Sequence, residues 1–234
     1  MKRFYRQVEV ASEGDAHRVL LDERPVRTPA KRALTLPTAT LAAAIAAEWR
    51  DQSETIRPAT MPLTRLASTV LDRLPGLRKA AIAELMGYAD TDLLCYRAAA
   101  PLDLVERQGH VWQPLLDWAA STYGARLVVT TSILPVAQPE VAVHCLRAAI
   151  EALDDWTLIG LHAATTALGS LILGLAVVEG RIGADQALAA SLLDELFEIE
   201  RWGQDAETER RHTALRRDLE AAAGFLSAVA GDRG

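Results

Sequence analysis

The pattern of apolar and polar positions along the chain changes its period near residue 57. Before that point, apolar residues occur in short alternating runs between polar turns, which is typical of small antiparallel sheets. After it, they recur every three or four residues, as on the buried faces of helices. The pattern therefore predicts an α+β fold in which a small antiparallel sheet precedes a larger helical part. The expected strands are Phe4–Val10 and residues 18–21, 26–28 and 33–36.

A helix is expected between the last strand and the longer helical part. Thr38 is a candidate N-cap, and apolar positions continue through Leu41 to Trp49. This helix should cover one face of the sheet, because a few short strands need a packing partner. The pattern breaks around Arg57-Pro58. We therefore expect an N-terminal α/β domain of residues 1–57 and a C-terminal helical domain of residues 58–234.

The C-terminal domain is expected to be a helical bundle. Its apolar stripes are separated by proline and glycine, which fit poorly inside helices. Residues 126–131 are rich in β-branched side chains and could form either a strand or an extended crossing. The expected helices cover residues 62–74, the region of 81–86, and residues 101–123, 139–153, 156–178, 184–202 and 205–229.

The run from Trp156 to Val178 contains no charged residue and is long enough to cross a bilayer core. It also contains His162 and several hydroxyl side chains, it has no second apolar run beside it, and its flanks lack a clear positive side. These features favour a buried central helix of the bundle over a membrane anchor. His162 would then be a core histidine with a hydrogen-bond partner.

Composition limits the function classes. The formal net charge of −6 over 234 residues argues against a nucleic-acid-binding protein, which needs a basic face. The two cysteines, Cys95 and Cys145, are far apart and are expected to be free thiols of a reducing compartment. No signal peptide or transit peptide is recognisable before Phe4, so we expect a cytoplasmic, bacterial protein that is not inserted in a membrane.

Known catalytic motifs are missing from the sequence. It contains no HExxH, GxSxG, P-loop or strand-linked GxGxxG pattern, and its five histidines are scattered. We therefore expect no enzyme, no catalytic residue, no cofactor and no metal site. Two alternatives remain open: a helical enzyme or small-molecule-binding protein with an unrecognised site near His162, and a membrane-associated protein anchored by residues 156–178.

The end of the expected helix 184–202 does not follow its own pattern. On a helical wheel, Glu200 falls within the apolar stripe, whereas Trp202 falls among the acidic residues. A carboxylate on an apolar face needs a partner, because an unpaired buried charge is costly. Either Glu200 pairs with a nearby arginine while the helix ends before Gly203, or this end is a docking surface for another protein. The wheel alone does not decide between them.

Six segments of the chain resemble the ATP twelve family, the assembly chaperones of the catalytic head of the rotary ATP synthase. They are spread between residues 4 and 207 and follow the family's order. The segments are FYRQVEV at 4–10, LDERPVRTPAKRALTLPT at 21–38, AAEWRDQSETIRPATMPLTRLASTVLDR at 46–73, YADTDLLCYRA at 88–98, ERQGHVWQPLLDWA at 106–119 and DELFEIERWGQDAE at 194–207.

The resemblance implies a non-catalytic protein that binds the free alpha subunit of the catalytic head. It would cover the alpha surface that later receives the beta subunit, until beta replaces it. The family's eukaryotic members are proteins of the mitochondrial matrix. The functional position that the resemblance implies is Glu200, the glutamate before Arg201-Trp202-Gly203. The partner-binding residues expected on this basis are Glu195, Glu200, Arg201, Trp202, Asp205, Asp90, Asp92 and Arg97. For the last three, local capping and pairing is the simpler interpretation.

Overall fold

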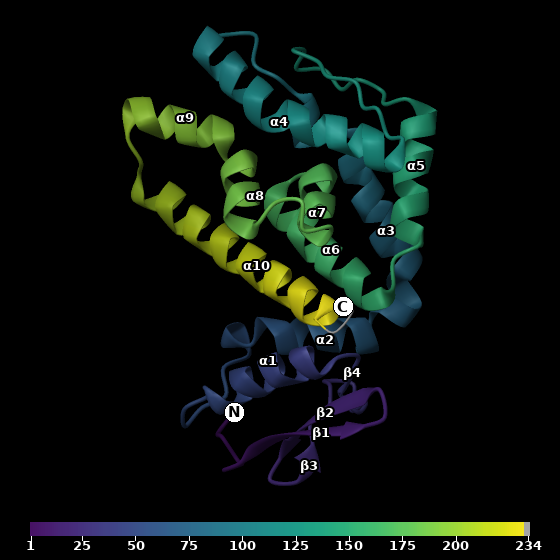
Figure 1. Cartoon of the computed structure of the whole chain (residues 1–234). Coiled ribbons are helices and arrows are strands. Elements are labelled where there is room, and N and C mark those ends of the chain that lie inside the picture. Colours follow the sequence, from purple (N-terminus) through teal and green to yellow (C-terminus); the bar gives the residue numbers. More distant parts are fainter. Residues whose placement is uncertain (232–234) are drawn as a thin grey trace. The chain divides into compact units, whose positions relative to one another are not determined.

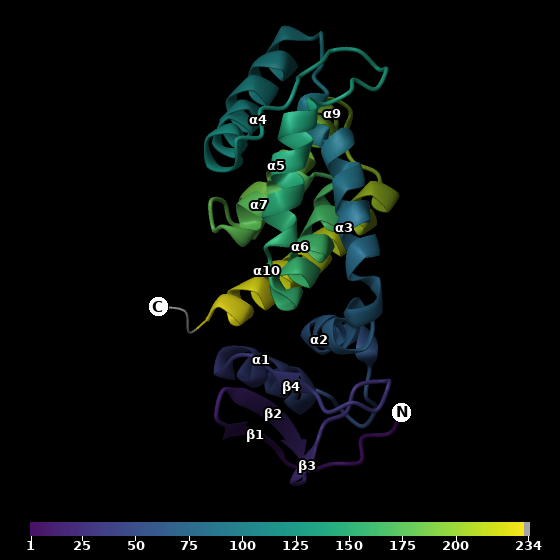
Figure 2. The ribbon, with the colours of Figure 1, turned by 90° about the vertical axis from the view of Figure 1, so that its right-hand side faces the viewer.

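The computed structural model of the chain describes residues 1–231 (Figures 1 and 2). Two compact units are present. Unit 1 contains Met1–Arg78, Asp155–Gly160 and the residues from Ala221 onward, and unit 2 contains Lys79–Asp154 and Leu161–Glu220. The α+β fold expected from the sequence is confirmed, with a small antiparallel sheet followed by helices. The division of the chain into domains at residue 57 stays a prediction.

The sheet of unit 1 is antiparallel and has β2 at its centre. Its strands are β1 (Val8–Glu13), β2 (Ala16–Leu21), β3 (Arg24–Pro25) and β4 (Thr35–Leu36). β1 pairs along the whole of β2, from Val8 opposite Leu21 to Glu13 opposite Ala16. β3 and β4 pair with the two ends of β2 on its other side.

The first strand begins four residues later than expected. Ladder pairing stops at Val8 because the chain turns at Asp22 and Glu23, both of which have positive φ. The carboxylate of Asp22 accepts hydrogen bonds from the backbone amides of Arg6 and Gln7, at 3.0 and 2.8 Å. The residues before Val8 are therefore tied to a turn rather than to a neighbouring strand. Alternation alone could not reveal this, because it reports burial and not pairing.

Helix α1 (Ala39–Arg50) lies on the sheet, in contact with β1, β2 and β4 (Figures 1 and 2). Thr38 is its N-cap, as expected, and accepts a hydrogen bond from the backbone amide of Leu41. The hydroxyl of Thr38 also donates to the carbonyl of Ala228, which ties the end of the chain to this helix. The core beneath α1 is built from Val19, Leu21, Leu34, Leu36, Leu41 and Ile45.

Unit 1 is completed by segments from distant parts of the sequence. The 3-10 helix η1 (Pro58–Thr60), α2 (Pro62–Asp72) and the start of α3 (Leu74–Asp90) follow α1. The rings of Trp156 and Phe225 stack with centroids 6.2 Å apart. Gly160 lies against Leu226, so closely that a Cβ at Gly160 would lie 2.4 Å from a methyl carbon of that leucine.

Unit 2 is helical. Besides parts of α3, α6 (Asp155–Leu168) and α10 (Ala206–Ala230), it contains η2 (Leu93–Cys95), α4 (Leu102–Tyr123), α5 (Glu140–Glu151), α7 (Leu171–Val178), α8 (Ala184–Ser191) and α9 (Leu193–Trp202). Gly124 ends α4 in the left-handed conformation that glycine favours. The open question about residues 126–131 resolves as an extended crossing, which makes a single parallel bridge between Thr130 and Tyr96.

The apolar run 156–178 is two helices, so the expectation of one continuous central helix is wrong. Gly169 has a φ of +66°, and its amide donates to the carbonyl of Thr165, which closes α6. Ser170 then caps α7 by accepting a hydrogen bond from the amide of Leu173. Most of the run is buried, as expected. None of the helices within residues 1–231 combines the length and the hydrophobicity needed to cross a membrane.

The expected helix 184–202 is also divided, at Leu192 between α8 and α9. Trp112 of α4 helps to hold this break, because its ring nitrogen donates to the carbonyl of Ala190 at 2.8 Å. Trp112 is fully buried, so this hydrogen bond lies in the core of unit 2. The break lets α9 leave the direction of α8 (Figure 1).

Candidate partner-binding site

Helix α9 carries most of the residues that the sequence singled out. Leu193 and Phe197 form its buried face, and α4 is in contact with it. Acidic residues stand in its first turn and Arg201 in its last, an arrangement that complements the helix dipole. Its charged side chains reach in two directions, toward α4 and toward α10.

On the α4 side, two ion pairs join the ends of the helices. Arg107 donates a hydrogen bond of 2.8 Å to one carboxylate oxygen of Glu200, and its other terminal nitrogen lies 2.8 Å from the second oxygen in an ion pair. Arg201 pairs with Asp103, one turn before Arg107. Both arginines also lie over the ring of Phe197, with guanidinium carbons 5.2 and 3.8 Å from its centroid. The last two turns of α9 are thus fixed to α4 by charge and by cation–π contact.

The contact with α4 explains why Glu200 lies within the apolar stripe of the helical wheel. That stripe faces α4, and Arg107 of α4 pairs with the carboxylate of Glu200. The side chain remains 55% exposed, so the pair lies at the rim of the contact. The hydrogen bond from Arg107 is the main cause that lowers the pKa of the Glu200 carboxyl below its usual range. The carboxylate is therefore ionised and already paired in the free protein.

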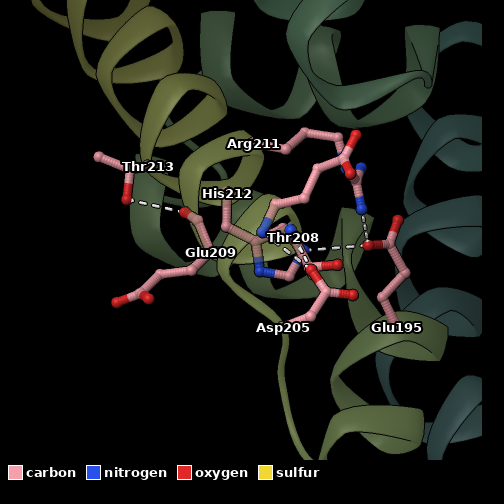
Figure 3. Close-up of polar contacts among 8 residues, drawn as sticks. Glu195, Asp205, Thr208, Glu209, Arg211, His212 and Thr213 are labelled. Carbon is pink, nitrogen blue, oxygen red and sulfur yellow. Dashed lines mark hydrogen bonds and ion pairs between the residues drawn. The ribbon is translucent and has the colours of Figure 1, made fainter.

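On the α10 side, Glu195 accepts hydrogen bonds from both Arg211 and His212 (Figure 3). The bond from His212 is 2.9 Å long. Partial burial raises the pKa of Glu195, but the hydrogen bonds from Arg211 and His212, together with their charges, leave that pKa below its ordinary value. Glu195 thus fixes the first turn of α9 to the beginning of α10.

Asp205 starts α10 after the turn at Gly203, whose φ is +84°. Its carboxylate accepts hydrogen bonds from the backbone amides of Glu207 and Thr208, at 2.9 and 2.7 Å (Figure 3 labels Asp205 and Thr208). These bonds lower the pKa of the Asp205 carboxyl, the bond from Thr208 first among them. Asp205 therefore acts as a helix cap, which fixes the direction in which α10 leaves α9.

Trp202 is the most exposed aromatic side chain near these groups, with 77% of its surface accessible. Beside it lies an open pocket of about 200 Å³ between the end of α9 and the start of α10. A large exposed indole next to a shallow hollow and flanked by charges is typical of a protein–protein contact. The pocket is lined by Glu195, Glu198, Ile199, Trp202, Gly203, Gln204, Asp205 and Thr208.

Asp92 lies apart from this surface and is fully buried. Its carboxylate accepts hydrogen bonds from the amides of Leu94 and Ile172 and from the hydroxyl of Ser170, at 3.0, 3.1 and 2.8 Å. Burial raises the pKa of Asp92, and these hydrogen bonds oppose the rise. Asp92 thus caps η2 and anchors the start of α7, which is a structural setting.

Arg97 and Asp90 have different surroundings. Arg97 donates to the carbonyls of Leu94 and Gln108, at 2.8 and 2.9 Å, and lies over the ring of Trp112. It therefore fastens the segment after η2 to α4. Asp90, the last residue of α3, is exposed, and within residues 1–231 no hydrogen bond or ion pair joins it to α9.

The other candidate groups have structural settings too. His162 is partly exposed rather than a core residue, and its ring nitrogen lies 3.0 Å from a carboxylate oxygen of Glu84. The expected hydrogen-bond partner is present. Cys95 is buried, and burial raises the pKa of its thiol to about 12, which leaves it unreactive.

The sequence alone did not identify the residues that pair with the charged groups of α9. These partners are Asp103, Arg107, Arg211 and His212. One signal did point to a partner of Glu200, because a carboxylate in an apolar stripe requires a cation on the facing element. The spacing of Asp103 and Arg107, four residues apart on one helix, was the second available signal. Which helix faces α9 is a tertiary property that the local pattern does not contain.

Comparison with known proteins identifies the family. Residues 2–120 match the profile described as ATP12 chaperone protein. The crystal structure of Atp12 from Paracoccus denitrificans is 44% identical to this chain, has a TM-score of 0.92, and the match covers 97% of this chain and 98% of that one. A lysine-for-aspartate mutant of the same protein matches with a TM-score of 0.93 at 44% identity, over 97% of both chains.

A further solved structure, of a protein from Agrobacterium tumefaciens, is 37% identical with a TM-score of 0.91, covering 97% of this chain and 85% of that one. These likenesses extend over both compact units, and the family described as a chaperone agrees with the expectation of a non-enzyme. By profile, identity and fold, this chain belongs to the ATP12 chaperone family.

Proposed function

We propose that this protein is an assembly chaperone of the ATP synthase that binds the free alpha subunit of the catalytic head. It would cover the alpha surface that later receives the beta subunit, and beta would then replace it. This protein would bind the alpha subunit in the cytoplasm. The observation that carries the proposal is family membership with near-complete coverage, at 44% identity to Atp12.

The surface proposed for this contact is the end of α9 with the start of α10. Trp202 is exposed there on a helix that is fixed on two sides, through Glu200 and Arg201 to α4 and through Glu195 to α10. A side chain held in place before binding loses less conformational freedom when the complex forms. Trp202 would be the apolar anchor, and Glu195, Glu200, Arg201 and Asp205 would set its position and the charge around it.

Asp90, Asp92 and Arg97 are proposed to contribute differently. Asp92 and Arg97 would support the surface by holding η2, α7 and α4 together. Asp90 would contribute as an exposed charge on the same unit.

The mechanism we propose is competitive capping. A free assembly interface is a large apolar patch, and such patches aggregate when bare. A chaperone that covers one needs only moderate affinity, because the beta subunit can displace it by mass action or through a larger interface. Release would then require no ATP hydrolysis by this chain.

Co-expression tests the proposal. The cognate alpha subunit is produced alone, with this chain, or with beta, and its soluble fraction and its partners are measured after affinity capture. The proposal expects a soluble complex of alpha with this chain. Aggregated alpha with no captured chain, under conditions where beta does keep alpha soluble, would refute it.

A further inference from the structure

Within residues 1–231, four polar contacts join helix α4 to the segment α8–α9, in antiparallel order. Two of them are hydrogen bonds: the carbonyl of Ala190 accepts one from Trp112, and the carboxylate of Asp194 accepts one of 2.7 Å from Gln108. Nearer the end of α9 follow two ion pairs, Glu200 with Arg107 and Arg201 with Asp103. The first two donors are buried, whereas the last two pairs are about half exposed. The contact therefore runs from the core of unit 2 to the surface beside Trp202.

We infer that Arg107 and Asp103 are positioning residues of the partner-binding surface, and that Glu200 acts through Arg107 rather than by touching the partner itself. This inference rests on the proposed function and names the part of the site that α4 supplies. It makes the recognition surface a product of two helices, with α9 presenting Trp202 and α4 holding α9 in place.

The geometry of the Arg107–Glu200 pair supports this assignment. Arg107 approaches both carboxylate oxygens of Glu200 to 2.8 Å, one through a charge-assisted hydrogen bond and the other in an ion-pair contact. The same guanidinium also lies over the ring of Phe197, which gives Arg107 a second contact with α9. A partner cation that used Glu200 directly would have to displace Arg107 from both contacts.

The two ion pairs also fix the helical turn that carries Trp202. Trp202 is the last residue of α9, and Gly203 after it has positive φ. Helix ends fray unless side chains fix them. The two ion pairs come from the two residues immediately before Trp202, so they fix the turn that carries the indole. Loss of either pair should release this turn without unfolding the buried part of the contact.

The test is a charge exchange in the full chain. Arg107→Glu, Glu200→Arg and the double variant are compared with wild type in two measurements: hydrogen exchange of the amides of residues 199–203 in the free protein, and the dissociation constant for the alpha subunit. Each single variant should exchange faster and bind about tenfold more weakly. The double variant should recover protection and come within about threefold of the wild-type affinity.

Either of two outcomes would overturn the inference. If Arg107→Glu binds like wild type while Glu200→Arg and the double variant both bind weakly, the partner reads the carboxylate of Glu200 directly. Unchanged exchange at residues 199–203 in the single variants would also overturn it. Failure of wild type to bind alpha would instead count against the proposed function, while the exchange data would still report on the pairing.

Discussion

At the scale of single residues, Glu195, Glu200 and Arg201 of α9 each have a charged partner in the free protein. Glu195 is held by Arg211 and His212, and Glu200 by Arg107. Exposed ion pairs of this kind contribute little to stability individually, usually below about 1 kcal/mol. Their effect is better described as geometric, because together they fix a helix whose end carries an exposed indole. Binding energy is then expected from Trp202, not from the charges.

Replacement of Trp202 by alanine should therefore separate binding from stability. Because the indole is 77% exposed, Trp202→Ala should leave the melting temperature nearly unchanged. It should weaken binding of the alpha subunit by about tenfold or more, the usual effect of removing an anchor aromatic. Isothermal calorimetry and thermal unfolding measure the two quantities.

A control for this prediction is Ile133→Ala, which removes another exposed apolar side chain, on the loop between α4 and α5. It should not change the affinity. If both substitutions weaken binding equally, binding depends on general surface hydrophobicity and not on the end of α9.

Asp92 and Asp90 form a second matched pair, two positions apart. Asp92→Ala removes three hydrogen-bond acceptor contacts from a fully buried site and leaves their donors unpaired. We expect it to lower the free energy of unfolding by about 2–3 kcal/mol. Asp90→Ala, at an exposed position, should change it by less than about 0.5 kcal/mol. Urea unfolding followed by circular dichroism measures both free energies. Equal effects would show that the buried hydrogen bonds of Asp92 do not stabilise the fold.

At the scale of elements, the positions of most helices and of the sheet could be predicted from periodicity and turn residues. Two helix breaks could not. The break at Gly169-Ser170 does have a local signature, a glycine C′ position followed by a serine N-cap, but a continuous apolar run conceals it. The break at Leu192 has no such signature, because it depends on Trp112 of α4 reaching Ala190. Long apolar runs report burial more reliably than they report where helices end.

The approach of α6 and α7 after their break gives a prediction about packing. A Cβ at Gly174 of α7 would lie 2.3 Å from the hydroxyl of Thr165 and 3.1 Å from a methyl carbon of Leu161. Gly174→Ala should therefore destabilise the protein by about 1–3 kcal/mol, since overpacking forces its neighbours to move. Gly87 of α3 has no neighbouring atom within 4 Å of such a Cβ.

Gly87→Ala is accordingly the control, and it should be neutral or stabilising by up to about 1 kcal/mol, because alanine favours the helix. The midpoint of thermal unfolding should be lower for Gly174→Ala and unchanged or higher for Gly87→Ala. A shift of the same sign and size in both would mean that the close contact between α6 and α7 is absent.

At the scale of the whole molecule, the sequence predicts the class of protein better than the site. The resembling segments are spread between residues 4 and 207, and the family is confirmed by profile and structure. The helical wheel left two interpretations of the end of α9 open, a glutamate paired with an arginine or a docking surface. It could not decide between them, because the helix that faces α9 determines whether Glu200 is paired. Asp103 and Arg107 lie more than ninety positions before their partners, at separations of 98 and 93 residues. No local pattern links residues that far apart.

The most direct test of the account is displacement from an isolated complex. Purified alpha subunit bound to this chain is mixed with increasing amounts of beta, without added nucleotide, and the species are separated by size-exclusion chromatography. Competitive capping predicts that this chain is released as the alpha–beta complex forms, in proportion to the beta added. A stable ternary complex of all three proteins, or no binding of the chain to alpha at the outset, would contradict it.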